Sequence, residues 1–169
     1  MDLEQAIKTA IGYETRVLDV YRRSASQTDD SIGKKVLSIL AREEQEHLDY
    51  LKERLNEWTQ TGKVKPARLK SALPTREQIK ESQKRLESQA PAGDTKAEQE
   101  ILVKALEMEQ ETSSFYKEMV HQLDQEGQAL FEPFVEIEEG HLMIVQAELD
   151  NLRGLGFWLD FQEFDLESG

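Results

Sequence analysis

Apolar residues recur every three or four positions along four segments of the chain, which is the spacing of one face of an α-helix. These segments are rich in Leu, Ala, Glu, Lys and Gln, which favour helices. We therefore expect four long helices, at residues 3–26, 30–59, 95–124 and 127–153. Asp29 or Asp30 is suited to cap the second helix and Asp94 the third, while Gly154 and Gly156 are suited to end the fourth.

The connection between the second and third helices is long. It runs from Gln60 to Gly93 and contains three of the four prolines, together with the polar segment Thr75–Ser88, which can form a short helix. Adjacent antiparallel helices rarely need such a connection, whereas a crossover along the length of a bundle does. The pattern predicts an all-α four-helix bundle over residues 1–154, built as two helical hairpins with a long crossover between helices 2 and 3.

The two halves of the chain match each other. Ala10–Glu14 align with Ala105–Glu109 after a shift of 95 residues, and Glu44–Leu48 align with Glu138–Leu142 after a shift of 94. The chain is therefore predicted to be a duplicated helical hairpin. A pseudo-twofold axis would bring the matched residues together.

Polar residues interrupt each apolar stripe at a position where the stripe should continue. In the second helix, the stripe passes Leu40 and resumes at Leu51, and the two stripe positions between them hold Glu44 and His47. The equivalent interruptions are Glu138 and His141 in the fourth helix, Glu14 in the first and Glu109 in the third. Four glutamates and two histidines should thus point inward at one level.

Burying unpaired carboxylates costs several kcal/mol apiece, so these side chains need a compensating charge. Two divalent cations would balance four carboxylates, and imidazole nitrogens would complete an oxygen and nitrogen shell suited to iron or manganese. The alternative is a set of buried salt bridges, but the stripes carry no Lys or Arg near these positions. We predict a dinuclear site in which Glu44 and Glu138 bridge the ions and Glu14 and Glu109 each close one end.

The Glu-x-x-His spacing is not specific by itself, because Glu118 and His121 share it. Glu118 follows Glu109 by nine residues, about half a revolution of the helix, and should face solvent. Six further glutamates flank the predicted ligands but are out of phase with the stripes, and we expect them on a solvated face: Glu43, Glu46, Glu107, Glu111, Glu136 and Glu139.

Two tyrosines occupy matching positions in the halves, Tyr21 in the first helix and Tyr116 in the third. They are either ordinary core aromatics, or partners of a ligand carboxylate or local redox buffers. The apolar segment 155–169 is expected to pack on the bundle or on a second subunit. A docking peptide for a larger partner is the other interpretation.

Composition narrows the chemistry. The chain has no cysteine, which excludes disulfides, iron-sulfur and zinc-thiolate sites, and a rubredoxin-type electron-transfer module. Its formal net charge of -13 argues against nucleic acid and anionic lipid as partners. No stretch has the character of a signal peptide or reaches transmembrane length, so we expect a cytoplasmic protein that does not enter a membrane.

The ligand pattern resembles the rubrerythrin branch of the ferritin-like di-iron carboxylate superfamily. The resemblance lies in Ala10–Leu55 and Ala105–Leu152, most visibly in Glu109–Tyr116 and Glu138–His141. It implies a ferritin-like bundle with a non-haem centre of two iron ions that reacts with hydrogen peroxide or dioxygen, usually in a homodimer. Manganese or a mixed pair would also suit the ligands.

Three features depart from that family. Typical rubrerythrins carry a rubredoxin domain, which this chain cannot form without cysteine. They also have an extra carboxylate one turn after the third-helix ligand, where this chain has Thr112. Pro133 should interrupt and kink the fourth helix one turn before Glu138.

These observations support three hypotheses. The first is a di-iron oxidoreductase that reduces peroxide or dioxygen, with electrons from a separate donor protein. The second is a ferroxidase or an iron-handling or packaged iron-storage protein, whose apolar tail would dock into a larger assembly. The third is a metal-free helical interaction module.

Overall fold

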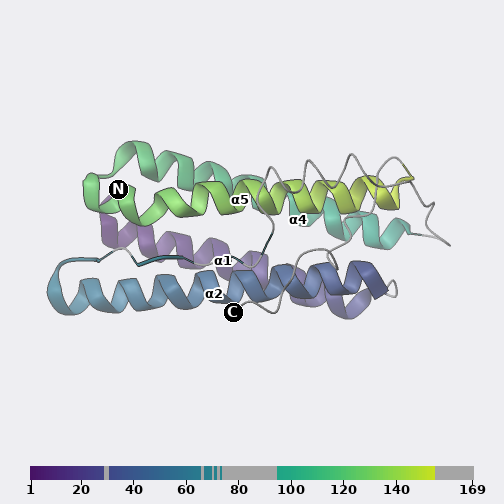
Figure 1. The fold of residues 1–169 in the computed structure, drawn as a ribbon, viewed down its shortest axis with the longest axis horizontal. Helices are drawn as coiled ribbons and strands as arrows, with labels where there is room; N and C mark the ends of the chain where they lie inside the picture. Colours follow the sequence, from purple (N-terminus) through teal and green to yellow (C-terminus); the bar gives the residue numbers. More distant parts are fainter. Residues whose placement is uncertain (29–30, 66, 70, 72, 74–94, 155–169) are drawn as a thin grey trace.

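The computed structural model describes residues 1–28, 31–65, 67–69, 71, 73 and 95–154. Within these residues the secondary structure is entirely helical, and the all-α four-helix bundle is confirmed (Figure 1). The four helices are α1 (Leu3–Gln27), α2 (Ser31–Thr61), α4 (Lys96–Gln122) and α5 (Gln125–Leu152). The segment 75–88, for which a short helix was predicted, and the apolar segment 155–169 lie outside the described residues.

The helices begin and end close to the predicted positions. The Asp2 side chain caps α1 by accepting a hydrogen bond from the Gln5 backbone N–H at 2.8 Å. Gly154 follows α5 with a φ of 68°, a left-handed conformation that favours glycine. α4 begins after Thr95, whose side chain donates to the Leu152 carbonyl at 3.1 Å. The predicted cap residue Asp94 lies outside the described residues. The other proposed cap residues, Asp29, Asp30 and Gly156, are not among the described residues.

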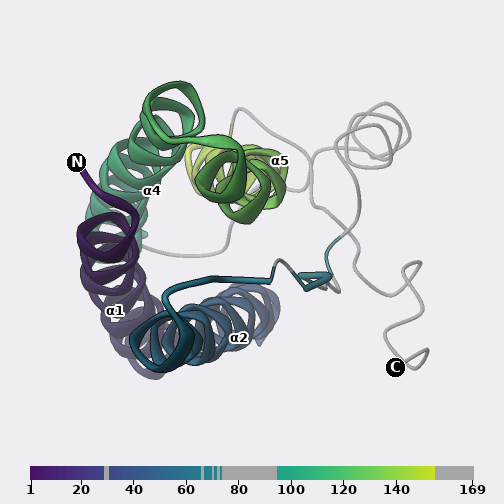
Figure 2. The same cartoon turned by 90° about the vertical axis from the view of Figure 1, so that its left-hand side faces the viewer.

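The helices form a ring in which α1 packs against α2 and α4, and α4 packs against α5 (Figure 2). α2 and α5 approach each other less closely than these pairs do. α1 and α5 run in one direction along the bundle, and α2 and α4 run in the other (Figure 1). The chain between α2 and α4 must therefore return along the whole bundle, as the length of the crossover predicted.

Two apolar clusters fill the bundle, one toward each end. One contains Tyr21, Leu40 and Ile144, and the other contains Leu51 and Phe134. Each helix passes from one cluster to the other, and the predicted polar interruptions lie between them. The fold thus places one polar layer in the middle of an apolar interior.

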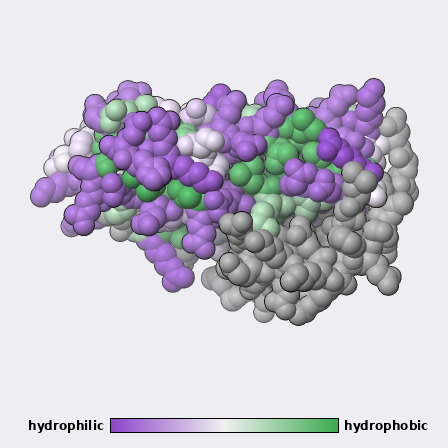
Figure 3. All heavy atoms as spheres, turned by 90° about the horizontal axis from the view of Figure 1, so that it is seen from above, coloured by the Kyte–Doolittle hydropathy of each residue, from purple (hydrophilic) through white to green (hydrophobic). Residues whose placement is uncertain are grey.

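The described surface is mainly polar. Figure 3 shows hydrophilic side chains over much of one face, with hydrophobic ones gathered in a smaller area. Among the described residues, Met1 is the one large hydrophobic side chain that is strongly exposed, at 58%. None of the described helices combines the length and the apolar character that crossing a bilayer requires.

Pro133 lies inside α5, which is continuous from Gln125 to Leu152, so the predicted interruption does not occur. Phe131 and Phe134 on either side of it are fully buried. Their packing compensates for the backbone hydrogen bond that proline cannot donate.

Replacing Pro133 with alanine is expected to raise the free energy of unfolding by about 1–3 kcal/mol, because the missing helix hydrogen bond is restored. Urea denaturation checks this, with Glu132→Ala on the exposed face of the same turn as the control. Unchanged or lower stability in Pro133→Ala would show that the proline fits its site better than a regular helix residue does.

Candidate metal centre

The structure brings the six sequence-predicted residues together in the polar layer. All six are fully buried, at 0% exposure: Glu14 from α1, Glu44 and His47 from α2, Glu109 from α4, and Glu138 and His141 from α5. Each helix contributes through the positions that interrupt its apolar stripe. The inward position predicted for all six from helical phase is therefore confirmed.

Glu14, Glu44 and Glu138 surround the imidazole of His47. Their oxygens lie 3.4 Å, 3.4 Å and 3.5 Å from His47 Nδ1, in that order. The ligand atoms of these four residues lie within 4.8 Å of one another, which is close enough to share one cation.

A second group of four is arranged in the same way around His141. The distances to His141 Nδ1 are 2.7 Å from Glu44, 3.5 Å from Glu109 and 3.8 Å from Glu138. The ligand atoms again lie within 4.8 Å of one another. Glu44 and Glu138 belong to both groups, and each turns one oxygen toward each histidine. Two carboxylates placed in this way could be shared by two neighbouring cations.

Hydrogen bonding within the described residues leaves much of the cluster unsatisfied. Both oxygens of Glu44 and Glu138 and both nitrogens of His47 and His141 have no hydrogen-bond partner there. Even His141 Nδ1 and the Glu44 oxygen 2.7 Å from it do not have the geometry of a hydrogen bond. Buried polar atoms are normally paired, so this donor set fits divalent cations.

The two tyrosines hold the outer carboxylates. The Tyr21 hydroxyl on α1 donates to Glu109 Oε1 on α4, and the Tyr116 hydroxyl on α4 donates to Glu14 Oε1 on α1. Burial, with the facing carboxylate adding to it, raises the pKa of both phenols well above the usual value, so both remain donors. The tyrosines are thus partners of the candidate ligands as well as core aromatics. Their redox role stays a prediction.

Burial and mutual repulsion divide the four carboxyls into two pairs. Burial raises the pKa of Glu44 and Glu138 well above the usual range, and neighbouring carboxylates raise it further. Burial also acts to raise the pKa of Glu14 and Glu109, but nearby cluster groups, the imidazoles among them, outweigh it. The net effect lowers the pKa of both, that of Glu14 to about 2. The bridging pair therefore holds protons more tightly than the outer pair.

The histidines also hold protons tightly. Burial alone would lower the pKa of an imidazole, but the surrounding carboxylates more than offset it. They raise the pKa of His47 to about 10 and also raise that of His141. In the absence of cations, protons on the imidazoles and bridging carboxyls balance the charge of the cluster. Divalent cations and protons thus compete for the same atoms.

Glu43 departs from its predicted place on the solvated face. It is buried, at 1% exposure, and its Oε2 accepts a hydrogen bond of 2.6 Å from Ser71 Oγ in the crossover. Its carboxylate lies close to His141 of α5 as well as to Ser71, so Glu43 faces α5 although it is out of phase with the apolar stripe of α2. The remaining five behave as predicted in that none is buried, although Glu139 is partly covered and pairs with Lys117 at 3.0 Å.

Glu118 and His121 are both exposed on α4, as their helical phase predicted. Thr112, at the position where the resemblance leads one to expect an extra carboxylate, is buried and donates to the Met108 carbonyl at 3.0 Å. Position relative to the stripe, and not the Glu-x-x-His spacing, separates the buried cluster from the surface pair.

No protein-family model matches the chain, and no curated protein or solved structure matches it. The fold and the site by themselves define the class of protein: an all-α four-helix bundle with a buried cluster of carboxylates and histidines that could hold metal ions.

Divalent cations are expected to stabilise the fold through this cluster, by about 2.7 kcal/mol per site at 100 times Kd. Thermal melting with and without Fe(II), Mn(II) or Co(II) under anaerobic conditions measures the effect. Glu138→Ala should abolish most of the metal-induced rise in Tm, because it removes a shared carboxylate. Glu118→Ala, the exposed counterpart, should retain the full rise, and an equal loss in both variants would contradict the assignment.

Metal affinity should increase with pH. The raised pKa values of His47, His141, Glu44 and Glu138 mean that protons must leave before a cation binds, so lowering the pH favours the protonated cluster. Calorimetric titration with Co(II) between pH 5.5 and 8 in buffers of different ionisation enthalpy would detect the released protons. Affinity that is independent of pH, with no proton release, would contradict this electrostatic description.

Proposed function

We propose that the protein is a non-haem di-iron oxidoreductase of rubrerythrin type that reduces hydrogen peroxide or dioxygen. The observation that carries the proposal is the sharing of Glu44 and Glu138 by two buried groups, each with its own histidine and outer glutamate. A single metal ion needs no such duplication. The oxygen and nitrogen donors suit iron, and they also suit manganese or a mixed pair.

The chain's own residues contribute geometry and charge. Glu44 and Glu138 would fix the separation of the two ions, while Tyr21 and Tyr116 orient the outer carboxylates through their hydrogen bonds. The apolar clusters on both sides exclude water and strengthen electrostatic interactions in the layer. Bound iron would supply the redox chemistry, cycling between the ferrous and ferric states.

Reduction of one hydrogen peroxide to two waters takes two electrons and two protons. Two Fe(II) ions, held by the six residues of the layer, would supply the two electrons, and repeated turnover would need an external reductant. A separate donor protein is part of the proposal, because a chain without cysteine has no rubredoxin-type module of its own. A homodimer, as the resemblance implies, is also part of it.

A ferroxidase is the second candidate, with Fe(II) itself as the reductant. A surface hollow beside α4 favours it, because Glu107, Glu111 and Glu118 line that hollow and would attract cations. Thr112 also stands where rubrerythrins, which the ligand pattern resembles, have the carboxylate that shifts an iron during peroxide reduction. Consumption of many Fe(II) per chain without a donor protein distinguishes a ferroxidase from a peroxidase.

Anaerobic protein loaded with two Fe(II) per chain should oxidise rapidly when mixed with peroxide or dioxygen, and stopped-flow absorbance of the ferric product follows the reaction. Glu138→Ala should oxidise at least tenfold more slowly than the unaltered chain, because it removes a shared carboxylate. Glu132→Ala, which removes an exposed glutamate of α5 that does not line the hollow beside α4, should match the unaltered chain. A loaded centre that is inert to both oxidants would rule out the oxidoreductase.

A further inference from the structure

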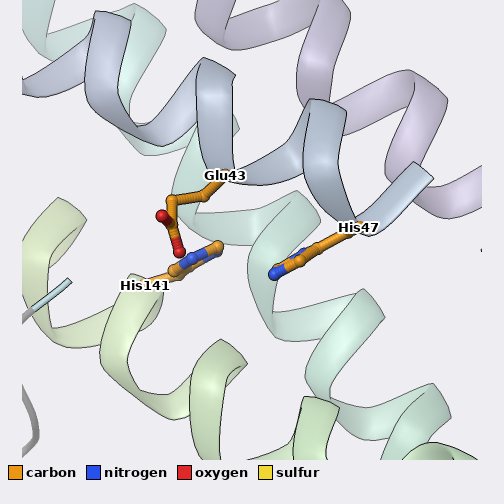
Figure 4. Close-up of side chains that lie close together, drawn as sticks. All are labelled: Glu43, His47 and His141. Atoms are coloured by element: carbon orange, nitrogen blue, oxygen red, sulfur yellow. The ribbon is translucent and has the colours of Figure 1, made fainter. Parts of the chain in front are cut away.

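Glu43 extends the polar cluster toward the surface. It projects from α2, and its carboxylate lies beside the imidazole of His141, with His47 on the next turn of α2 (Figure 4). Ser71, which donates to Glu43 Oε2 at 2.6 Å, is itself exposed. Exposed Ser71, buried Glu43 and the fully buried histidines thus form an ordered series from solvent to the polar layer.

The ligand atoms of Glu43, His47 and His141 lie within 4.8 Å of one another, as in the two inner groups. The two imidazole rings are almost parallel, with an interplanar angle of 10° and centroids 5.4 Å apart. Within the described residues, neither nitrogen of either ring has a hydrogen-bond partner, and both rings are fully buried. One carboxylate and two imidazoles form a donor set for a divalent transition-metal ion.

Glu43 lies on the side of the bundle where the helices pack least closely. α2 and α5 carry the three residues, and these helices approach each other less than the other neighbouring pairs do. The crossover, through Ser71, covers Glu43 on this side. A cation that approaches between α2 and α5 would therefore meet Glu43 before the inner carboxylates.

We propose that Glu43, His47 and His141 form a transfer site through which divalent cations pass between solvent and the dinuclear centre. This rests on the metal-binding part of the proposed function and not on its redox chemistry. Both histidines also belong to the inner groups, so a cation moving inward keeps an imidazole ligand while it exchanges Glu43 for the inner carboxylates. Continuous coordination avoids stripping the ion bare in an apolar interior, which would be costly.

The transfer site holds a cation only transiently. Its histidines are shared with the inner groups, and it adds one carboxylate to balance a third divalent charge. Repulsion from two ions already in place, at short range and low dielectric, prevents stable triple occupancy. Saturated protein therefore contains two ions per chain, and Glu43 governs the rate of loading and not the final content.

The test measures Co(II) uptake by metal-free full-length protein, with stopped-flow absorbance for the rate and elemental analysis for the final content. Glu43→Gln keeps the size of the side chain and removes its charge. It should bind two Co(II) per chain, as the unaltered chain does, but take them up at least tenfold more slowly. Release to a chelator should slow in parallel, because the route is the same in both directions.

Glu46→Gln is the matched control, because it removes the same charge from an exposed position on α2. It should load at the rate of the unaltered chain. Ser71→Ala, an exposed change that removes the hydrogen bond to Glu43, should slow uptake to a lesser degree and keeps the test valid if Glu43→Gln does not fold. Circular dichroism monitors folding.

Three results would overturn the transfer site. The first is an uptake rate within twofold of the unaltered chain in both Glu43→Gln and Ser71→Ala, and the second is a slowing in Glu46→Gln equal to that in Glu43→Gln. The third is the loss of one Co(II) per chain at saturation in Glu43→Gln, which would make Glu43 a permanent ligand. Failure of the unaltered chain to bind two Co(II) is a different result. It would remove the metal centre itself, and with it this inference and the proposed function.

Discussion

The burial of four carboxylates and two imidazoles in one layer is the constraint on which the rest of the structure depends. Each of these groups would be cheaper to keep in water, and the hydrogen bonds that the apolar clusters above and below supply come from two tyrosine hydroxyls, which reach only the outer carboxylates Glu14 and Glu109. The apolar stripes of the four helices face the interior of the bundle, so the polar residues that interrupt these stripes are brought together there. Glu44 and Glu138, which belong to both groups, are the hardest of the four to ionise, because burial and repulsion from neighbouring carboxylates both raise their pKa. The fold thus creates an electrostatic demand that divalent cations would meet.

The duplicated hairpin gives this layer its symmetry. Tyr21 and Tyr116 each cross between α1 and α4 to hold the outer carboxylate that the other half supplies. Neither half could build the layer alone, because each group of four draws on both hairpins. The layer is therefore complete only when the two hairpins pack together.

Helical phase was the property that allowed most of this to be predicted from sequence. It identified the helices and separated Glu109, in the stripe, from Glu118, half a revolution away. It failed at Glu43, which lies beside His141 of α5 and accepts a hydrogen bond from Ser71, in a connection whose path no periodicity encodes. It also missed that Pro133 fits within a continuous α5, since the compensating packing is tertiary. The tyrosine hydrogen bonds join helices from different halves, so the repeat could suggest them but not fix their partners.

Whether the layer holds two iron ions can be measured by anomalous X-ray scattering at the iron edge, from crystals of protein made with ample iron. We expect two peaks inside the bundle, each next to one of His47 and His141 and both bounded by Glu44 and Glu138. A bundle without anomalous density in this layer, with the same carboxyls paired only to one another and to the imidazoles, would contradict this expectation.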